Sequence, residues 1–350
     1  MNIYLSNKIK NISLLLMIMV VFLHSYNLDT KGLNQVLVNS KNFIWMIQNF
    51  ISYGVTRIAV PFFFVISGFL FVFDGKISFL ELVIKIKKRI RTVFVPFITW
   101  SLLGICFYLF LQQIPQTKFF FTNKLIYDYT IRDFFNVLIY KPIPYQLWFL
   151  RDLMVLMILS PLILYLIKSM RVILFTTVLV FWLLNYDSVF LTSEALLFFL
   201  AGITISENFK YFLEIKIKNL SLPIIWLFLL IMQLVCMFYD LKALSILCSK
   251  FAILIGIPSL WILYDVLSEN FTFERKIEKI TWATFFIYVF HEPFLSFIKK
   301  ITFFVLGKNS IIIFINYFIA PIIVITISVF FAYFLKATLP VIYKILTGGR

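Results

Sequence analysis

The sequence predicts an all-α membrane protein: one domain, residues 1–350, built as a bundle of about ten transmembrane helices with both termini in the cytoplasm. Of the 350 residues, 62% are apolar and only 14% are charged. Soluble domains have about 45–50% apolar and about 25% charged residues. A soluble globule has too little interior to bury so much apolar surface, so lipid must be the main solvent of this chain.

Ten apolar runs approach or reach the length of about 17–25 residues that a spanning helix needs. The fifth and sixth are short and are separated by Asp187 and Ser188, so we expect them to pair as a tight hairpin. The first run has Lys8 and Lys10 in front of it but no cleavage site after it, which excludes a cleaved signal peptide. The ten runs are 11–28, 48–73, 92–112, 147–167, 172–187, 190–206, 219–239, 244–267, 280–298 and 311–335.

An even number of crossings places both termini on one side, and the basic residues indicate which side. The connections on the side of the termini contain 19 Lys and Arg residues, and those on the other side contain 10. Positive charge is retained in the cytoplasm, so the prediction is a multi-pass protein of the cell (inner) membrane. The net charge of +16 has the same explanation, and we expect no nucleic-acid partner. The outer connection 113–146 is expected to cap a cavity.

Ionisable side chains at membrane depth are costly and usually functional. The only two histidines, His24 and His291, both fall in or near the ends of predicted spans. Neutral imidazole takes up and returns a proton near pH 7, so both are candidate catalytic residues. Arg57, Asp152 and Glu292 are the other candidates discussed below. For Lys250 and Asp265, near span ends, we expect helix pairing or snorkelling only.

Arg151 and Asp152 follow Leu147-Trp148-Phe149-Leu150. Adjacent residues on a helix point about 100° apart, so we expect each to contact another helix rather than its neighbour. An interhelical ion pair and a role toward substrate are equally compatible with this pattern.

Two further segments have alternative interpretations. The basic segment 85–91 precedes a proline-containing apolar run and suits the positive-inside bias, anionic lipid or a phosphorylated ligand. Ser67-Gly68 allows close approach of another helix or makes room for a ligand. The three cysteines have no metal-ligand spacing, and no metal site is expected.

Together these residues resemble the acyltransferase 3 family, integral membrane acyltransferases of bacterial surface polysaccharides. Five motifs match in the family's order over nearly the whole chain. They are the first-span histidine in VVFLHS (20–25), FFFVISGFL (62–70), KRIRTVFVPF (88–97), LWFLRDL with SPL (147–153, 160–162) and FIYVFHEP (286–293). One position departs: many members have an arginine eleven residues before the first-helix histidine, where this chain has Ser13, which leaves Lys10 as a partial substitute.

The resemblance implies transfer of an acyl group, with acetyl expected, from cytoplasmic acyl-CoA to a hydroxyl of a surface or exported polysaccharide or its precursor. Acyl-CoA is then a substrate and no cofactor is permanently bound. In this interpretation His24 is the general base, with Arg151 and His291 as further catalytic residues. The donor phosphates are expected at Lys87, Lys88, Arg89 and Arg91. The acceptor is expected near Arg57, Ser67, Trp148, Asp152 and Glu292.

Two other classes of function fit a bundle of this kind. A polysaccharide or lipid-linked sugar transporter without acyl transfer is the alternative, because ten spans with buried charges also suit transport. Against it, the sequence has no repeated halves. A membrane scaffold without chemistry would leave both histidines unexplained.

Overall fold

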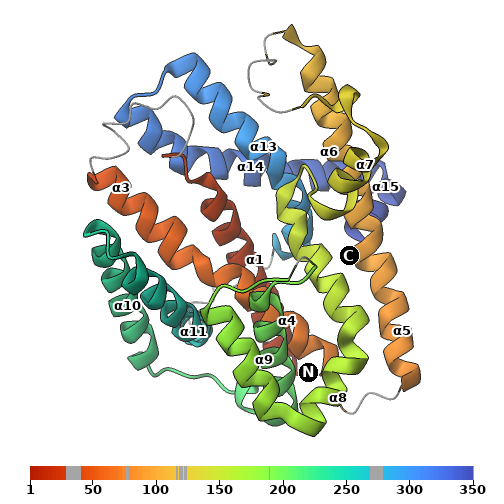
Figure 1. Ribbon diagram of the computed structural model, residues 1–350, viewed down its shortest axis with the longest axis vertical. Coiled ribbons are helices and arrows are strands. Elements are labelled where there is room, and N and C mark those ends of the chain that lie inside the picture. The colour runs from red at the N-terminus through yellow and green to blue at the C-terminus, as the bar shows by residue number, and fades with distance from the viewer. Residues whose placement is uncertain are drawn as a thin grey trace.

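The structure, a computed structural model, describes residues 1–28, 41–73, 75, 79–115, 117, 121, 124–188, 190–268 and 279–349. Helix makes up 85% of it, and the described part contains no strand (Figure 1). Seven helical stretches in this part are long and apolar enough to cross a membrane. They are Ile3–Ser25 (α1), Phe43–Val72 (from α3, Phe43–Gln48, to α4, Ala59–Val72), Leu80–Gln113 (most of α5, Phe79–Arg89, with α6, Val95–Gln113), Tyr145–Leu183 (mainly α8), Ser221–Phe238 (α10), Lys242–Leu267 (α11) and Ser310–Thr338 (α14).

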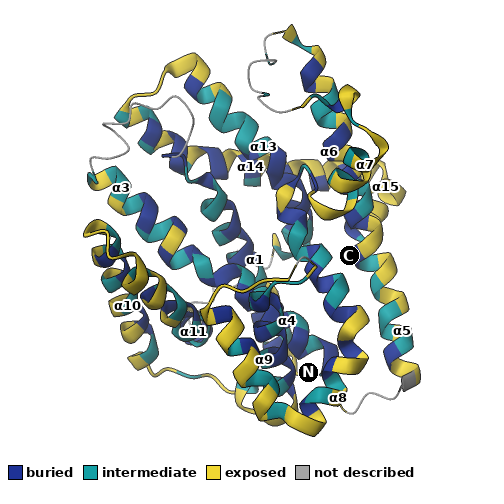
Figure 2. Ribbon diagram, viewed as in Figure 1, coloured by how far each residue is buried: buried dark blue, intermediate teal, exposed yellow. Residues whose placement is uncertain are grey.

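The two remaining predicted runs also form helices. One is α9 (Ser193–Asn208), which has 16 residues, and the other is α13 (Thr284–Leu306), which contains Glu292 and two lysines. A short amphipathic helix, α15 (Pro340–Thr347), ends the chain. An all-helical membrane protein is therefore confirmed. Figure 2 shows the buried residues concentrated along α1 and α4, with α10 more exposed.

The helix α8 (Trp148–Leu183) joins the fourth and fifth predicted runs. It is broken at Met170, whose backbone (φ −145°, ψ 46°) is not helical. A straight helix would rise about 46 Å from Asp152 to Leu183, and the residues from Leu183 to Thr192 can span only about 31 Å. Asp152 nevertheless accepts a hydrogen bond from Thr192 at 2.9 Å. The two halves of α8 therefore fold back on each other at Met170.

Helices α4 (Ala59–Val72) and α9 pack backbone to backbone through two glycines. A Cβ atom built on Gly68 would lie 2.1 Å from the Phe199 carbonyl oxygen, and one on Gly202 would lie 2.1 Å from that of Val65. Neither position has room for a side chain. The close approach predicted from Gly68 is confirmed, because small residues let membrane helices meet at this distance.

We expect Gly202→Ala to destabilise the protein by about 2–3 kcal/mol, because the new methyl group must push two helix backbones apart. Thermal unfolding in detergent measures the loss. Thr204→Ala on the same helix is the control, since the buried Thr204 hydroxyl has no hydrogen-bond partner among the described residues. Equal unfolding temperatures for the two variants would show that α4 and α9 do not meet at Gly202.

The first helix begins earlier than predicted, at Ile3 rather than near residue 11. Lys8, expected in front of the span, is fully buried within it. Its ammonium lies 2.5 Å from the Asp265 carboxylate and 3.9 Å from the centre of the Trp261 ring. Tyr4 and the Ile217 N–H also donate to Asp265. The pair joins the start of α1 to the end of α11, as expected for Asp265 but not for Lys8.

Replacing Lys8 with methionine would leave the Asp265 carboxylate buried without its cation. The cost of breaking such a pair is about 3–5 kcal/mol. We expect Lys8→Met to unfold at a clearly lower temperature, and Lys8→Met/Asp265→Asn to regain part of the loss. Lys10→Met, at an exposed position of the same helix, should change stability little. If Lys8→Met proved as stable as Lys10→Met, the ion pair would not hold these helices together.

The connection predicted to cap the outer mouth contains short helices. Ile126–Asp128 (η5), Ile131–Phe135 (α7) and Asn136–Tyr140 (η6) follow one another. Hydrogen bonds from Lys124 and Thr130 hold the pKa of the exposed Asp133 carboxyl at about 2. The predicted connections 29–41 and 269–279 lie almost wholly outside the described residues.

Candidate active site at the end of α1

The two histidines meet, although 267 positions separate them in the chain. His24 lies in the last turn of α1, and His291 lies in the middle of α13. Their rings stack with centroids 5.5 Å apart and planes 18° apart. The edge of the Tyr145 ring packs on His24 at 4.9 Å. His24 is half-buried and His291 is fully buried, so His24 is the member of the pair that a substrate can reach.

The hydrogen bonds of His291 indicate its tautomer. Its Nδ1 lies 2.7 Å from the Tyr288 carbonyl oxygen and 3.2 Å from that of Ile287. A carbonyl only accepts, so Nδ1 bears the hydrogen and the neutral ring keeps a lone pair on Nε2. That buried Nε2 has no hydrogen-bond partner in the described part of the chain. The histidine pair therefore contains a proton acceptor that no described residue uses.

Proline shapes α13 at this point. Pro293 has no N–H, and the residue before a proline is pushed toward extended backbone. Glu292 accordingly has φ −107° and ψ 138° and breaks the helix. Gln146 Nε2 donates to the Glu292 carbonyl at 3.0 Å and to that of Val289 at 3.4 Å. Gln146 thus takes the place of the helix hydrogen bond that Pro293 cannot make.

A frame of hydrogen bonds holds the pair in place. The Glu292 carboxylate, 2% exposed, accepts from Ser296 at 3.0 Å and from Tyr145 at 3.4 Å. The Tyr288 hydroxyl donates to the Gln146 carbonyl at 2.6 Å. These contacts tie the start of α8 to the broken segment of α13. They fix the Tyr145 ring that packs on His24.

Cations surround the end of α1. Lys299 Nζ donates to the carbonyls of His24 at 2.7 Å and Tyr26 at 3.1 Å, which suits the negative end of a helix dipole. The charges of Lys299 and Arg57 both act on His24. Arg57 lies in a 3-10 turn, Val55–Ile58 (η2), that follows a π-helical segment, Asn49–Gly54 (η1). Its side chain is 39% exposed, and its only ion pair in the described part of the chain, with Glu194, is long at 3.9 Å.

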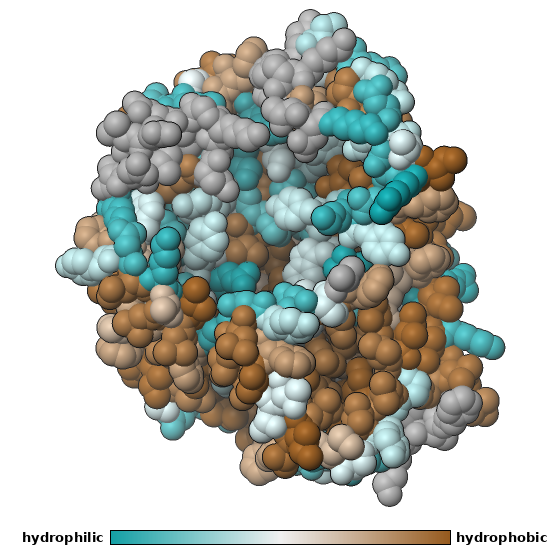
Figure 3. Space-filling view, in the orientation of Figure 1, coloured by the Kyte–Doolittle hydropathy of each residue, from teal (hydrophilic) through white to brown (hydrophobic). Residues whose placement is uncertain are grey.

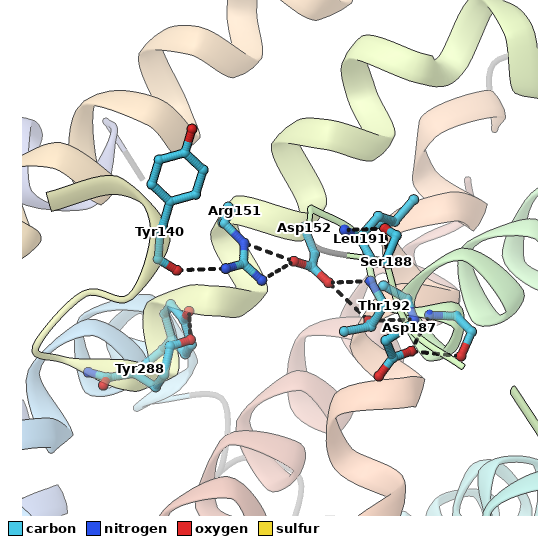
Figure 4. Close-up of polar contacts among 11 residues, drawn as sticks. Tyr140, Arg151, Asp152, Asp187, Ser188, Leu191, Thr192 and Tyr288 are labelled. Carbon is cyan, nitrogen blue, oxygen red and sulfur yellow. Dashed lines mark hydrogen bonds and ion pairs between the residues drawn. The ribbon is translucent and has the colours of Figure 1, made fainter. Parts of the chain in front are cut away.

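Arg151 and Asp152 belong to a separate network, drawn in Figure 4. Arg151 donates to the Asp152 carboxylate at 3.0 and 3.2 Å and to the Tyr140 carbonyl at 2.7 Å. Asp152 accepts from the N–H and hydroxyl of Thr192, the N-cap of α9, at 3.0 and 2.9 Å. The expected contact of Asp152 with another helix is confirmed, but the expectation that it would not pair with Arg151 is wrong. The two Cβ atoms point in different directions, but the arginine side chain is long enough to bend toward Asp152.

A second carboxylate strengthens the start of α9. Asp187 accepts from the N–H and hydroxyl of Ser193, both at 2.8 Å. Two carboxylates thus face the positive end of the helix dipole, where negative charge is stabilising. The network joins the first half of α8, and the connection that follows its second half, to α9, which is an architectural role.

The other predicted residues have contacts elsewhere in the bundle or lie at its surface. Trp148 packs on Phe64 at 6.2 Å, and Ser67 is half-buried beside the Gly68 contact. The four basic residues lie on α5 (Phe79–Arg89) and a π-helical turn, Ile90–Phe94 (η3). Lys87, Lys88 and Arg91 are exposed. Arg89 is half-buried and has no ion pair in the described ranges.

The basic residues and the histidines lie near opposite ends of α4. Ser52 donates to the Phe22 carbonyl, close to His24, and Lys85 donates to that of Phe71. The helix from Ser52 to Phe71 rises about 28 Å. A ligand held at both places must therefore extend through most of the bundle.

The family is decided by comparison of the whole chain. A family model described as an acyltransferase domain, acyltransferase 3, matches residues 10–336, nearly the whole chain. The chain belongs to this family. Comparisons with curated proteins and with solved structures found no match. With its apolar helices, the protein is a multi-pass membrane acyltransferase.

Within this acyltransferase, sequence reasoning missed several residues of the site. Four of them contact the histidine pair or the hydrogen bonds that hold it: Tyr145, Gln146, Tyr288 and Lys299. Tyr145 and Gln146 directly precede the LWFLRDL motif, and Tyr288 lies three residues before His291. Proximity to the motifs was the available signal. Ser13, at the position of the family's arginine, donates to its own helix at the Ile9 carbonyl.

Proposed function

We propose that this acyltransferase moves an acyl group, with acetyl expected, from acyl-CoA to a hydroxyl of a cell-surface or exported polysaccharide or its precursor. The stacked pair of His24 and His291 is the observation that supports acyl transfer most. It places an accessible imidazole over a buried one, in a frame that holds both rings. An accessible imidazole is the usual general base for a hydroxyl nucleophile.

In the proposed reaction His24 removes the proton from the acceptor hydroxyl as its oxygen attacks the thioester carbon. The new C–O bond forms, and the carbonyl oxygen becomes an oxyanion. Collapse of this intermediate breaks the C–S bond, and the thiolate takes the proton from His24. Arg57 suits oxyanion stabilisation or acceptor orientation better than Arg151, because its guanidinium has one long ion pair instead of three short hydrogen bonds. In an alternative scheme His24 itself attacks the thioester, releases the thiol and carries the acyl group until the acceptor hydroxyl takes it.

We further propose ten crossings with both termini in the cytoplasm of the cell (inner) membrane. The contacts alternate as this requires: Lys8 with Asp265 and Arg171 with Glu207 on one side, and Asn27 with Gln48 and Lys41 with Asp240 on the other. The two halves of α8 then cross separately. The connections on the same side as Lys8 contain the excess of Lys and Arg residues, which supports the assignment of that side to the cytoplasm.

The donor is proposed to enter from that cytoplasmic side, with its phosphates at Lys87, Lys88, Arg89 and Arg91. Half-buried Arg89 supports this, since an arginine without a carboxylate partner is suited to phosphate. The acceptor was expected near Glu292, Trp148, Ser67 and Asp152. Of these, Glu292 directly follows His291 and accepts from Tyr145. The exposed tyrosines Tyr53 and Tyr145 offer aromatic faces to a sugar at this place.

Removing donor contacts should raise KM more than it lowers kcat. We expect Lys87→Gln/Lys88→Gln/Arg91→Gln to raise the KM for acyl-CoA by at least about tenfold, since hydrogen bonds to charged groups are each worth about 1.5–3 kcal/mol. Steady-state kinetics in lipid nanodiscs measures both constants. Lys344→Gln, at an exposed lysine of α15, is the control. An unchanged KM in the triple variant would exclude this segment from donor binding.

The function itself is tested with the purified protein in nanodiscs. Release of free thiol from acetyl-CoA and other short acyl-CoAs is followed with and without glycan acceptors, and mass spectrometry detects acylated sugar. We expect thiol release that depends on an acceptor, with one acyl group added per thiol. Absence of turnover with every donor and acceptor, by folded protein, would count against the proposal and in favour of glycan transport.

A further inference from the structure

A second site lies far from the histidines, where the pair α4 and α9 meets the pair α10 and α11 (Figure 1). A cavity of about 390 Å³ lies there, a size typical of small-molecule sites. All the residues that line it are apolar. They include Ile9 of α1, Phe62 and Val65 of α4, Ala201 of α9, and Leu254 and Trp261 of α11.

The burial of the lining shows where the cavity opens. The residues from α1 and α4 are buried, as are Trp261 and Ile262. Those on the facing parts of α9 and α11, Ala201, Ile205, Leu254 and Ile257, are half-buried. Leu213, Ile217 and Leu222, from the segment between α9 and α10, are half-buried too. The cavity therefore opens between α9 and α11, in the apolar part of the bundle. Spanning helices are surrounded by lipid chains, and the lower part of the face drawn in Figure 3 is largely apolar.

Positive charge borders the end of the cavity on the side of the N-terminus. Lys10 is exposed directly after Ile9, and Lys216 is exposed directly before Ile217. Lys216 lies 5.4 Å from the Tyr4 ring, close enough for its charge to act on Lys8. Lys218 follows in the same segment. Among the described residues, the carboxylates at this rim include Asp265, bound to Lys8, and Glu214, which accepts from the backbone N–H of Asn2 at 3.4 Å.

We propose that this cavity binds an anionic phospholipid of the leaflet at which α1 begins. One acyl chain enters between α9 and α11, and the phosphate lies against Lys216 and Lys10. An apolar cleft open to lipid accepts a chain, and basic side chains at the membrane surface attract anionic headgroups by about 1 kcal/mol each. The site lies about 22 Å along α1 from His24, since Ile9 is fifteen residues before it. It is thus separate from the proposed reaction centre.

Native mass spectrometry of the full-length protein in mild detergent tests the proposal, with dioleoyl phosphatidylglycerol as the probe and dioleoyl phosphatidylcholine for comparison. We expect one tightly retained phosphatidylglycerol and a higher unfolding temperature in its presence. Ala201→Trp fills the cavity and should abolish the retained lipid, and Leu254→Phe is the milder second variant. Lys216→Gln should weaken phosphatidylglycerol binding about fivefold and leave phosphatidylcholine binding unchanged.

Two matched controls separate this site from general lipid adhesion. Leu227→Trp changes an exposed apolar position of α10, and Lys242→Gln removes an exposed lysine at the other end of α11. Both should bind like the wild type. Retention of phosphatidylglycerol by folded Ala201→Trp and Leu254→Phe would overturn the proposal. Equal stabilisation by inorganic phosphate would also overturn the proposal, because the acyl chain of the lipid would then contribute nothing to binding.

Discussion

Replacing His24 with alanine should lower kcat for acyl transfer by about 10²–10⁴-fold, the usual contribution of a general base. The imidazole is the only accessible proton acceptor of the histidine pair, and His291 behind it is fully buried. The KM for acyl-CoA should change little, because the proposed donor phosphate site lies near the other end of α4. Steady-state rates of thiol release measure both constants.

Structural damage must be distinguished from loss of the base. Tyr145 and His291 both pack on His24, so thermal unfolding of His24→Ala and His24→Gln is measured beside the rates. His291→Gln should lower kcat less than His24→Ala, since His291 supports the ring of His24. Wild-type turnover in either stable His24 variant would remove His24 from the chemistry.

Replacing Asp152 with alanine should destabilise the protein by about 3–5 kcal/mol, the cost of removing one partner from a buried ion pair. Asp152 is fully buried and has four donated contacts, two from Arg151 and two from Thr192. Its loss leaves the arginine and the start of α9 without their acceptor. Thermal unfolding in detergent measures the change.

A matched exposed carboxylate provides the control for Asp152. Asp133→Ala, which removes the contact with exposed Lys124, should shift the unfolding temperature only slightly. Arg151→Met should be destabilising too, and at a temperature where the variant remains folded its kcat should stay near that of the wild type. A large loss of kcat in folded Arg151→Met would restore the catalytic role that the sequence suggested.

The fold was largely predictable because lipid imposes long apolar helices. The ten runs correspond to helices or halves of helices, and the two histidines that the family motifs bring out meet in the structure. What the sequence could not provide was long-range pairing. Lys8 finds Asp265 across 257 positions, and no local pattern indicates that a basic residue near the terminus is buried beside a tryptophan.

The candidate site shows the same limit at short range. The motif suggested a catalytic role for Arg151 and acceptor binding for Asp152, and helix geometry favoured contacts with other helices. The flexible guanidinium nevertheless reaches the carboxylate next to it. Gln146 was overlooked because its role depends on the helix break at Pro293, which leaves carbonyls for it to bind. Such residues become visible only when both helices are placed together.

The central claim is that His24 accepts the proton during acyl transfer across the bundle. Sealed proteoliposomes test it most directly, with the donor-side face of the protein inward, ¹⁴C-acetyl-CoA trapped inside and a soluble glycan outside. We expect ¹⁴C label on the external glycan with the wild-type protein and none with folded His24→Ala. Label transferred equally by both proteins, or recovered only on the inner side, would contradict it.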